Sequence, residues 1–201
     1  MASFCEEIQP DVENDRNEEL REIIRKCCRK DKKSQEMLYK HFFGYALSIA
    51  LIYNKQRNEA IDIVNDSFMK VFSEISKFDP EKPFKSWLRK IVINTSIDHF
   101  RRERRNSFFE EKDSVLIADH NANVISNLTA KDVVGLLNRL PEIQKNVFSL
   151  YEIEGFSHEE ISERLRIPAN SSRVYLTRAK KKLRELFPLY FNTYDERLGN
   201  R

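Results

Sequence analysis

Hydrophobic residues recur at helical spacing along most of the chain. Over residues 18–30 they follow the i, i+3, i+4, i+7 order of an amphipathic helix. The same pattern predicts helices over 34–53, 58–75 and 85–105, with Ser34 as the N-cap of the second. Residues 77–84 hold two prolines, which exclude a continuous helix there. We therefore expect four helices in the N-terminal half.

The helical pattern lapses over residues 107–128 and returns at about residue 130. Pro141 then opens a helix that Gly155 terminates, Ser157 with Glu160 forms a capping box, and a last long helix covers 171–187. No stretch alternates as a strand does. The sequence predicts an all-α fold of two small helical bundles joined by a flexible linker. The expected divisions are an acidic tail (1–17), a first bundle (18–106), the linker (107–129), a second bundle (130–190) and a C-terminal tail (191–201).

Composition narrows the possible functions. The chain has 201 residues, 40% hydrophobic and 33% charged, with only 4 Gly and 6 Pro. This mix excludes a disordered chain and a Gly-rich phosphate loop. No apolar run approaches ~18 residues and the N-terminus is acidic, so we expect a cytoplasmic protein without membrane insertion. The four scattered His and three Cys lack metal-ligand spacing, and no nucleophile lies beside a base. We expect no catalytic residue, metal or cofactor.

Charge is segregated along the chain, although the net charge is only +3. Residues 164–184 hold eight basic side chains and no acidic one. A second basic cluster, at residues 101–105, contains four arginines around a single glutamate. Each cluster lies on a predicted amphipathic helix, so the two together indicate two contacts with a polyanion.

The C-terminal third has the order of a helix-turn-helix: short helix, compact turn, basic second helix. Residues near the start of the second helix would reach base edges in the major groove, and Arg173 can form a bidentate contact with guanine. Lys180, Lys181, Lys182 and Arg184 would contact phosphates. The exposed positions of this helix are predicted to be Asn170, Ser171, Ser172, Arg173, Tyr175, Thr177 and Arg178. The alternative is a three-helix packing module with a basic surface.

The N-terminal half carries two further candidate surfaces. The helix over 85–105 has a polar stripe that follows two aromatic residues of the proline-containing loop, Phe78 and Phe84. A basic helix beside aromatic rings suits an unpaired, stacked base. The alternative is that these rings and Trp87 belong to the core. The preceding helix exposes a polar edge suited to a basic protein partner. The stripe comprises Lys90, Asn94, Asp98, Arg101 or Arg102, and Arg105; the edge comprises Asp62, Asn65, Asp66 and Lys70.

From about residue 18 to 186, the chain resembles the extracytoplasmic-function (ECF) sigma factors, small two-domain initiation factors of bacterial RNA polymerase. Residues 60–72 resemble the part of sigma region 2 that binds the β′ clamp of the polymerase. Residues 84–102 resemble the part that melts and reads the minus-ten element. Residues 140–183 resemble region 4, which reads the minus-thirty-five element.

The resemblance implies a role for each matched residue. The residues that it assigns to polymerase binding are Asp62, Asn65, Asp66, Phe68, Met69 and Lys70. Minus-ten binding falls to Phe78, Lys85, Trp87, Arg89, Lys90, Asn94, Asp98, Arg101, Arg102 and Arg105. Minus-thirty-five binding falls to Asn170, Ser171, Ser172, Arg173, Tyr175, Thr177, Arg178 and Lys181.

The implied function is that of an alternative sigma factor. Its expected partners are core RNA polymerase, through the β′ clamp and the β subunits, promoter DNA and an anti-sigma factor. Two other readings stay open. A conventional helix-turn-helix regulator would use its N-terminal bundle to dimerise, and a sigma mimic would titrate an anti-sigma factor without binding DNA. Binding to core polymerase separates the first from a sigma factor, and a DNA shift assay separates the second.

Overall fold

A computed structural model describes residues 10–107 and 130–198, where every regular element is helical. The N-terminal module comprises α1 (Pro10–Cys28), α2 (Lys32–Tyr53), α3 (Arg57–Glu74), the 3-10 turn η1 (Ile75–Lys77) and α4 (Phe84–Ser107). The C-terminal module comprises α5 (Ala130–Leu137), α6 (Glu142–Phe148), the π-helical turn η2 (Ser149–Ile153), α7 (His158–Leu165) and α8 (Ala169–Leu198). The prediction of two all-α bundles is confirmed. Within the described ranges, no helix is long and apolar enough to cross a membrane.

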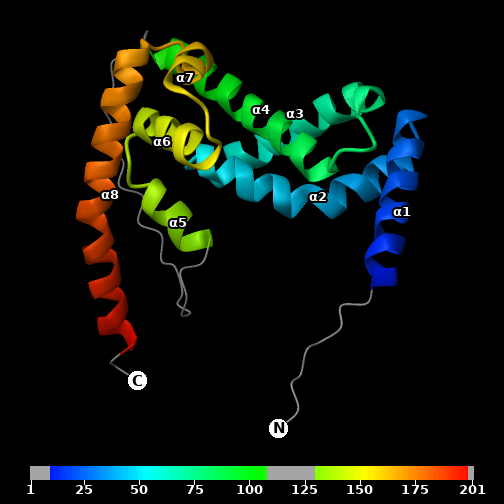
Figure 1. Ribbon diagram of the computed structural model, residues 1–201, viewed down its shortest axis with the longest axis horizontal. Coiled ribbons are helices and arrows are strands. Elements are labelled where there is room, and N and C mark those ends of the chain that lie inside the picture. The colour runs from blue at the N-terminus through cyan, green and yellow to red at the C-terminus, as the bar shows by residue number, and fades with distance from the viewer. Residues whose placement is uncertain (1–9, 108–129, 199–201) are drawn as a thin grey trace.

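The N-terminal module is built on mutual packing of α2, α3 and α4, with α1 laid across one end (Figure 1). Its core is made by apolar side chains that recur at helical spacing and are buried from solvent. Small residues at Ala46 and Ala50 let α2 lie close to its neighbours. The larger core residues include Leu38, Ile63, Val64, Leu88 and Val92. The apolar stripes read from the sequence are therefore the faces that pack together.

The helix ends differ from the expected ones in identifiable ways. Asp31, not Ser34, caps α2, because its carboxylate accepts the Ser34 backbone N–H at 2.8 Å while Ser34 is buried in the first turn. Helix α1 begins at Pro10, inside the predicted acidic tail, and α8 runs to Leu198, through most of the predicted C-terminal tail. Residues 1–9, 108–129 and 199–201, which include most of the predicted linker, lie outside the described residues.

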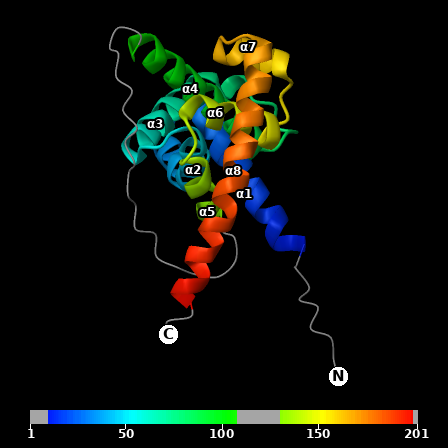
Figure 2. The same cartoon turned by 90° about the vertical axis from the view of Figure 1, so that its left-hand side faces the viewer.

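The C-terminal module is organised by the long helix α8. Helices α5, α6 and α7 all contact it, and Figure 2 shows α8 crossing in front of the molecule. Pro141 precedes α6 as expected, because a proline lacks the N–H that a first helical turn leaves unpaired. Gly155, at φ +75°, follows η2 and turns the chain toward α7.

The two modules also contact each other, which the sequence did not predict. Helix α2 contacts α5 and α6, and α4 contacts α7. Ile52 of α2 packs against the cluster formed by Leu137, Leu140 and Ala179, and one larger apolar cluster contains residues of both modules. The bundles are therefore joined by packed side chains as well as by the chain between them.

Candidate polymerase and nucleic-acid interfaces

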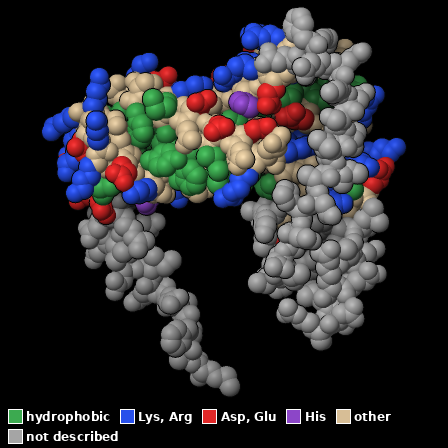
Figure 3. Space-filling view, turned by 180° about the vertical axis from the view of Figure 1, so that it is seen from behind, with side chains coloured by type: hydrophobic (Ala, Val, Ile, Leu, Met, Phe, Trp, Pro, Cys, Tyr) green, Lys and Arg blue, Asp and Glu red, His purple; other side chains and the backbone are tan. Residues whose placement is uncertain are grey.

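The outer edge of α3 is polar and carries one large apolar side chain. Asp62, Asn65 and Asp66 are exposed, and Met69 is 70% exposed. Asn65 is held in place because its Oδ1 accepts a hydrogen bond from the Tyr39 hydroxyl at 2.9 Å. An exposed methionine beside two carboxylates is a surface suited to a partner that is basic and partly apolar. Apolar side chains gather on the N-terminal module in the view of Figure 3.

Two residues predicted to bind the polymerase lie elsewhere: Phe68, assigned from the family resemblance, and Lys70, assigned from helical spacing as well. Phe68 is 2% exposed and packs edge-on against Tyr39, with the ring centroids 4.9 Å apart. Its side chain therefore belongs to the core beneath the edge. Lys70 is half-buried and reaches α4, where its Nζ lies 3.5 Å from Asp98 Oδ2. Lys70 thus links the polar edge of α3 to the basic helix α4.

The aromatic residues before and within α4 form one cluster. Phe84 is buried and lies against Phe42, with ring centroids 4.9 Å apart. Phe78 and Trp87 are half-buried, and their centroids are 5.2 Å apart. Phe84 is therefore a core residue, as the alternative reading held. Phe78 and Trp87 rest on the core and retain some surface, which leaves both as candidates for stacking on a base.

Four basic α4 side chains predicted to bind the minus-ten element face solvent. Lys85, Lys90, Arg102 and Arg105 are exposed. Lys85 lies over the Tyr45 ring, with its Nζ 5.9 Å from the centroid. Exposed cations spaced along one helix are suited to successive phosphates of a nucleic-acid strand.

Other α4 side chains predicted to bind the minus-ten element contact the C-terminal module instead. Arg89 makes a two-pronged contact with Glu154: Nε donates to Oε2 at 2.9 Å and Nη2 to Oε1 at 2.6 Å. The side chains of Arg89 and Glu154 are 30% and 9% exposed. The hydrogen bonds that Arg89 donates to Glu154 raise the pKa of Arg89 further. A bidentate guanidinium–carboxylate pair with little solvent contact is among the stronger polar links between two surfaces.

Glu154 also binds the end of α2. Its Oε1 accepts the Tyr53 hydroxyl at 3.1 Å, and Tyr53 is buried. Burial, and then the neighbouring negative charge of Glu154, raises the pKa of Tyr53, so its hydroxyl remains a donor. This one carboxylate therefore holds α2 and α4 together with the turn before α7.

Two further contacts join α4 to α7. Arg164 donates from Nη1 to Asn94 Oδ1 at 2.8 Å, and Arg101 donates from Nη2 to the Glu163 carbonyl at 3.1 Å. The Arg164 guanidinium also lies 4.0 Å from the centroid of the Phe156 ring. Asp98 stays on α4, where Arg101 Nη1 donates to its Oδ1 at 3.3 Å. Arg89, Asn94 and Arg101, all predicted to bind DNA, are thus occupied by the C-terminal module.

The helix-turn-helix geometry is present in α7 and α8. Ser157 and Glu160 form the predicted capping box at the start of α7. Arg166 takes the left-handed conformation at its end, with φ 51° and ψ 53°. The turn is fixed by Ser162, whose hydroxyl donates to the Ile167 carbonyl at 2.6 Å. Helix α8 then starts at Ala169, two residues before the predicted position.

Most of the predicted recognition residues lie on the outer side of α8. Asn170, Arg173, Thr177, Arg178 and Lys181 are exposed, and Ser171 and Tyr175 are half-buried. Arg173 is held between α7 and α8, because it donates to Glu159 Oε1 at 2.8 Å and to Asn170 Oδ1 at 3.1 Å.

Ser172 differs from the other predicted recognition residues. It is fully buried, and its hydroxyl lies 3.0 Å from His158 Nδ1. It was predicted to be exposed, but it fastens the recognition helix to the supporting helix instead.

The residues that sequence reasoning missed are those of the module contact. Tyr53, Glu154 and Glu163 were given no functional role from the sequence, and Arg164 was counted only as one charge of the basic segment 164–184. Their importance comes from two surfaces meeting, which no spacing within one segment reveals. The single available signal was a glutamate placed directly before the helix-terminating Gly155.

Comparisons with known proteins agree with this geometry. The chain matches the family models for sigma-70 region 2 over residues 38–106 and for sigma-70 region 4 over residues 131–183. It is 25% identical to the ECF RNA polymerase sigma-E factor of Haemophilus influenzae over 171 residues, covering 79% of this chain and 90% of that protein. It is 26% identical to the RNA polymerase sigma factor SigV of Bacillus subtilis, covering 68% of this chain and 80% of that protein.

A solved structure is also similar. It is the structure of the sigma factor RpoE in complex with the anti-sigma factor NepR from Bartonella quintana. The matched chain is 24% identical to this one with a TM-score of 0.47, and the match covers 76% of this chain and 96% of that chain. The two family matches correspond to the two modules, in the same order along the chain. The chain therefore belongs to the sigma-70 family of RNA polymerase sigma factors, in its extracytoplasmic-function group.

Proposed function

We propose that this chain is an alternative sigma factor that binds core RNA polymerase through α3 and directs initiation by contacting the minus-ten element with α4 and the minus-thirty-five element with α8. The observation that carries the proposal is the presence, on one chain with both sigma regions, of two separate basic helices and a polar docking edge. A conventional regulator needs only one of these three surfaces.

Polymerase binding is assigned to the exposed edge of α3. Asp62, Asn65, Asp66 and Met69 would contact the β′ clamp, and Lys70 would shape the edge through its ion pair with Asp98. Phe68 contributes by packing beneath Met69's helix rather than by touching the partner. Burying the Met69 side chain supplies apolar area, while the carboxylates complement a basic surface. The C-terminal module would contact the β subunits.

Minus-ten recognition is assigned to α4 and the aromatic loop before it. Lys85, Lys90, Arg102 and Arg105 would hold backbone phosphates, and Phe78 with Trp87 would offer surface to an unstacked base. Unstacking costs a few kcal/mol, which stacking and phosphate contacts offset. Arg89, Asn94 and Arg101 would join this surface only after they leave the C-terminal module.

Minus-thirty-five recognition is assigned to the N-terminal half of α8. Arg173 and Asn170 would read base edges in the major groove, with Ser171, Tyr175, Thr177 and Arg178 beside them. Lys181 would contact phosphate. Buried Ser172 would act by fixing the angle between α7 and α8 through His158.

The working cycle requires the two modules to separate. While Glu154 and Arg164 hold α4, their partners Arg89 and Asn94 cannot also contact DNA. Linking two weak DNA contacts on one chain raises their combined affinity. The proposed divisions are a tail at 1–17, region 2 at 18–106, a linker at 107–129, region 4 at 130–190 and a tail at 191–201. Bound polymerase and promoter would compensate for the lost module contacts.

Further parts of the proposal concern the setting of the protein. It would work in the cytoplasm, without bond chemistry of its own, and an anti-sigma factor would hold it inactive. Support for the last point comes from surfaces that such a partner could cover, namely the α3 edge and α4. A sigma mimic is the second candidate, but the exposed cations on both α4 and α8 favour DNA binding.

The proposal is tested by a binding experiment with two parts. The purified chain is mixed with core RNA polymerase and passed through a size-exclusion column, and the complex is then tested for a gel shift of promoter DNA. A sigma factor enters the complex and shifts the DNA. A conventional regulator shifts DNA without entering the complex, and a sigma mimic gives neither result; each of these outcomes would refute the proposal.

A further inference from the structure

A cleft between α4 and the end of α7 is lined by arginines from both modules. We call it the arginine cleft. Its volume is about 600 Å³, and its lining consists of Asp98, Arg101, Arg102, Arg104, Arg105, Leu165 and Arg166. The lining thus contains five guanidinium groups and one carboxylate. A concave site with this charge favours an anion.

The single carboxylate of the arginine cleft is already shared. Asp98 Oδ1 accepts a hydrogen bond from Arg101 at 3.3 Å, and Asp98 Oδ2 lies 3.5 Å from Lys70 Nζ. Arg102 Nε lies 3.4 Å from the Asp98 backbone carbonyl. The charge of Asp98 is therefore divided between two cations, Arg101 and Lys70.

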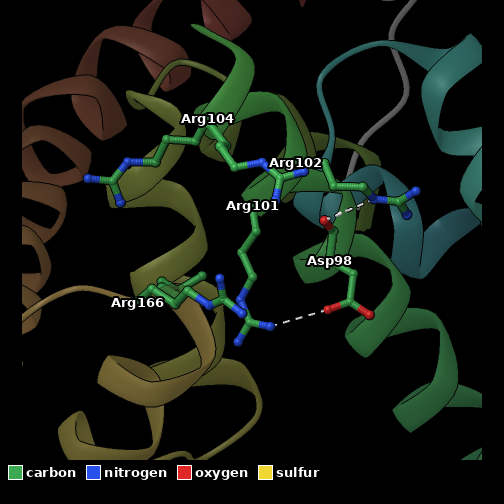
Figure 4. A pocket seen from close by; sticks show the side chains of 7 residues that line it. Asp98, Arg101, Arg102, Arg104 and Arg166 are labelled. Carbon is green, nitrogen blue, oxygen red and sulfur yellow. Dashed lines mark hydrogen bonds and ion pairs between the residues drawn. The ribbon is translucent and has the colours of Figure 1, made fainter. Parts of the chain in front are cut away.

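Arg101 and Arg166 come from different modules and reach toward one another (Figure 4). Arg101 Nε is buried and has no hydrogen-bond partner among the described residues. Bringing two cations together raises the free energy unless an anion lies between them. This part of the cleft therefore has positive charge from both modules available for a ligand.

The backbone fixes where Arg166 is presented. It is the left-handed C-cap residue of α7, its own N–H donates to the Ser162 carbonyl, and the Ser162 hydroxyl binds the Ile167 carbonyl at 2.6 Å. The Arg166 side chain itself is exposed. A guanidinium that projects from a fixed turn loses little backbone freedom when it binds a ligand.

We propose that the arginine cleft binds a condensed phosphate anion, either inorganic or the phosphate chain of a nucleotide. Guanidinium forks match phosphate oxygens, and linked phosphates place several charges within one small cleft. Because the ligand would bridge Arg166 of one module and Arg101 of the other, it holds the modules together. It also competes with minus-ten DNA for α4. The site therefore adds ligand control to a sigma factor and goes beyond promoter binding.

Calorimetry at constant ionic strength tests the site. The probes are sodium triphosphate, ATP and, as a non-condensed anion, sulfate. We expect saturable one-to-one binding of triphosphate or ATP, and no comparable binding of sulfate. Triphosphate binding as tight as that of ATP assigns the site to the phosphate chain alone, and tighter ATP binding assigns it to nucleotides. No saturable binding of either, or equal binding of sulfate, overturns the proposal.

A matched pair of variants locates the site. Arg166→Asn removes the guanidinium and keeps a residue that tolerates the left-handed conformation. It should weaken triphosphate binding about ten-fold or more, as the loss of a charge-assisted hydrogen-bonding group does. Lys30→Asn is the control, because exposed Lys30 has φ 62° and lies outside the cleft. Equal affinities of the two variants would place the ligand elsewhere and refute the site.

A gel shift of promoter DNA by the complex with core polymerase, run without nucleotides, separates this inference from the proposed function. Arg166 is not among the residues assigned to either promoter element, so without triphosphate Arg166→Asn should shift the DNA as the native chain does. Triphosphate should release the DNA from the native complex and leave it bound to the Arg166→Asn complex. If the native complex shifts the DNA but triphosphate has no effect, the cleft proposal fails while the sigma function stands. Binding of single-stranded DNA fragments is measured for the same variant. If Arg166→Asn weakens binding of single-stranded DNA as much as binding of triphosphate, the cleft is part of a DNA groove, and the proposal is refuted.

Discussion

Two side chains on α8 are suited to different contacts with DNA: one to the edges of the bases and one to the phosphates. Arg173 is braced by Glu159 and Asn170 at the start of the helix, whereas Lys181 is exposed further along. The backbone N–H of Glu159 and the Arg173 guanidinium lower the pKa of Glu159, so this brace is ionised near neutral pH. A preorganised fork suits base-edge contacts, and an exposed lysine suits phosphates.

Replacing Arg173 should therefore change sequence preference. Arg173→Ala should cost about 1–3 kcal/mol on the preferred upstream element and little on altered ones. Lys181→Ala is the comparison: it should weaken binding to all sequences and lower the slope of affinity against salt by about one ion. Fluorescence anisotropy over a set of upstream elements and salt concentrations measures both. Uniform losses from Arg173→Ala would contradict its role in reading bases.

Met69 offers a second test at the residue scale. Met69→Ala removes the large exposed apolar side chain of the α3 edge and should weaken binding to core polymerase by about 1–2 kcal/mol. Met37→Ala is the matched control, because Met37 is also exposed but lies on α2 beside Lys26 and Arg29. Competition against a labelled sigma factor for core polymerase measures the affinities. A larger loss from Met37→Ala would move the polymerase interface away from α3.

At the scale of elements, sequence periodicity predicted which faces of the helices pack, and it was weakest at helix ends. The stripe of Ile63 and Val64 is buried as expected, because burial of apolar area dominates the choice of face. Ends depend on local caps: Asp31 was available three residues before Ser34, and either could cap. Phe68 also follows the apolar stripe and is buried; it was the family resemblance that assigned it to the polymerase surface. Ser172 shows the other weakness, because it adjoins exposed positions and only packed geometry decides which of two neighbours faces inward.

Helix α6 contains an element-scale anomaly, a fully buried lysine at the module boundary. Lys145 Nζ donates to Asn138 Oδ1 at 3.3 Å, and burial lowers its pKa to about 7. Glu142 and Glu59 oppose this shift, whereas Lys55 adds to it. Burial also raises the pKa values of Glu142 and Glu59. The group as a whole is thus held in the folded state at an electrostatic cost.

This lysine predicts a pH dependence of stability. Between about pH 7 and its ordinary pKa of 10.5, Lys145 is neutral in the folded chain and protonated in the unfolded one. The unfolded state then binds more protons, so this group makes stability rise with pH, by about 1 kcal/mol per unit. Lys145→Met should lack that rise. Urea unfolding at pH 7 and pH 9 measures the slopes, and identical slopes for the two proteins would contradict the shifted pKa.

At the scale of the whole molecule, the decisive feature is the contact between the modules. Arg89, Asn94 and Arg101 of the predicted minus-ten surface bind the C-terminal module, so the described arrangement is closed with respect to DNA. The family resemblance indicated both modules and their order. It did not indicate this contact, because the contact depends on the fit between two folded surfaces rather than on a pattern within either.

Weakening the contact should open the molecule. Glu154→Gln preserves shape but removes the charge that Arg89 binds, and should cost the closed arrangement about 1–3 kcal/mol. Small-angle scattering should then report a larger radius of gyration. Glu163→Gln makes the same change on an exposed α7 side chain and should leave the radius unaltered. If Glu154→Gln has the same radius of gyration as the native chain, Glu154 does not hold the modules together.

The most direct test of the account is promoter-specific run-off transcription. Core polymerase free of other sigma factors is supplied with fragments of the genome that encodes this chain, with and without the purified chain. Discrete transcripts should form only when the chain is present, with shared sequence elements upstream of their start points and a higher initial yield from Glu154→Gln. No discrete transcript with either form of the chain would contradict it.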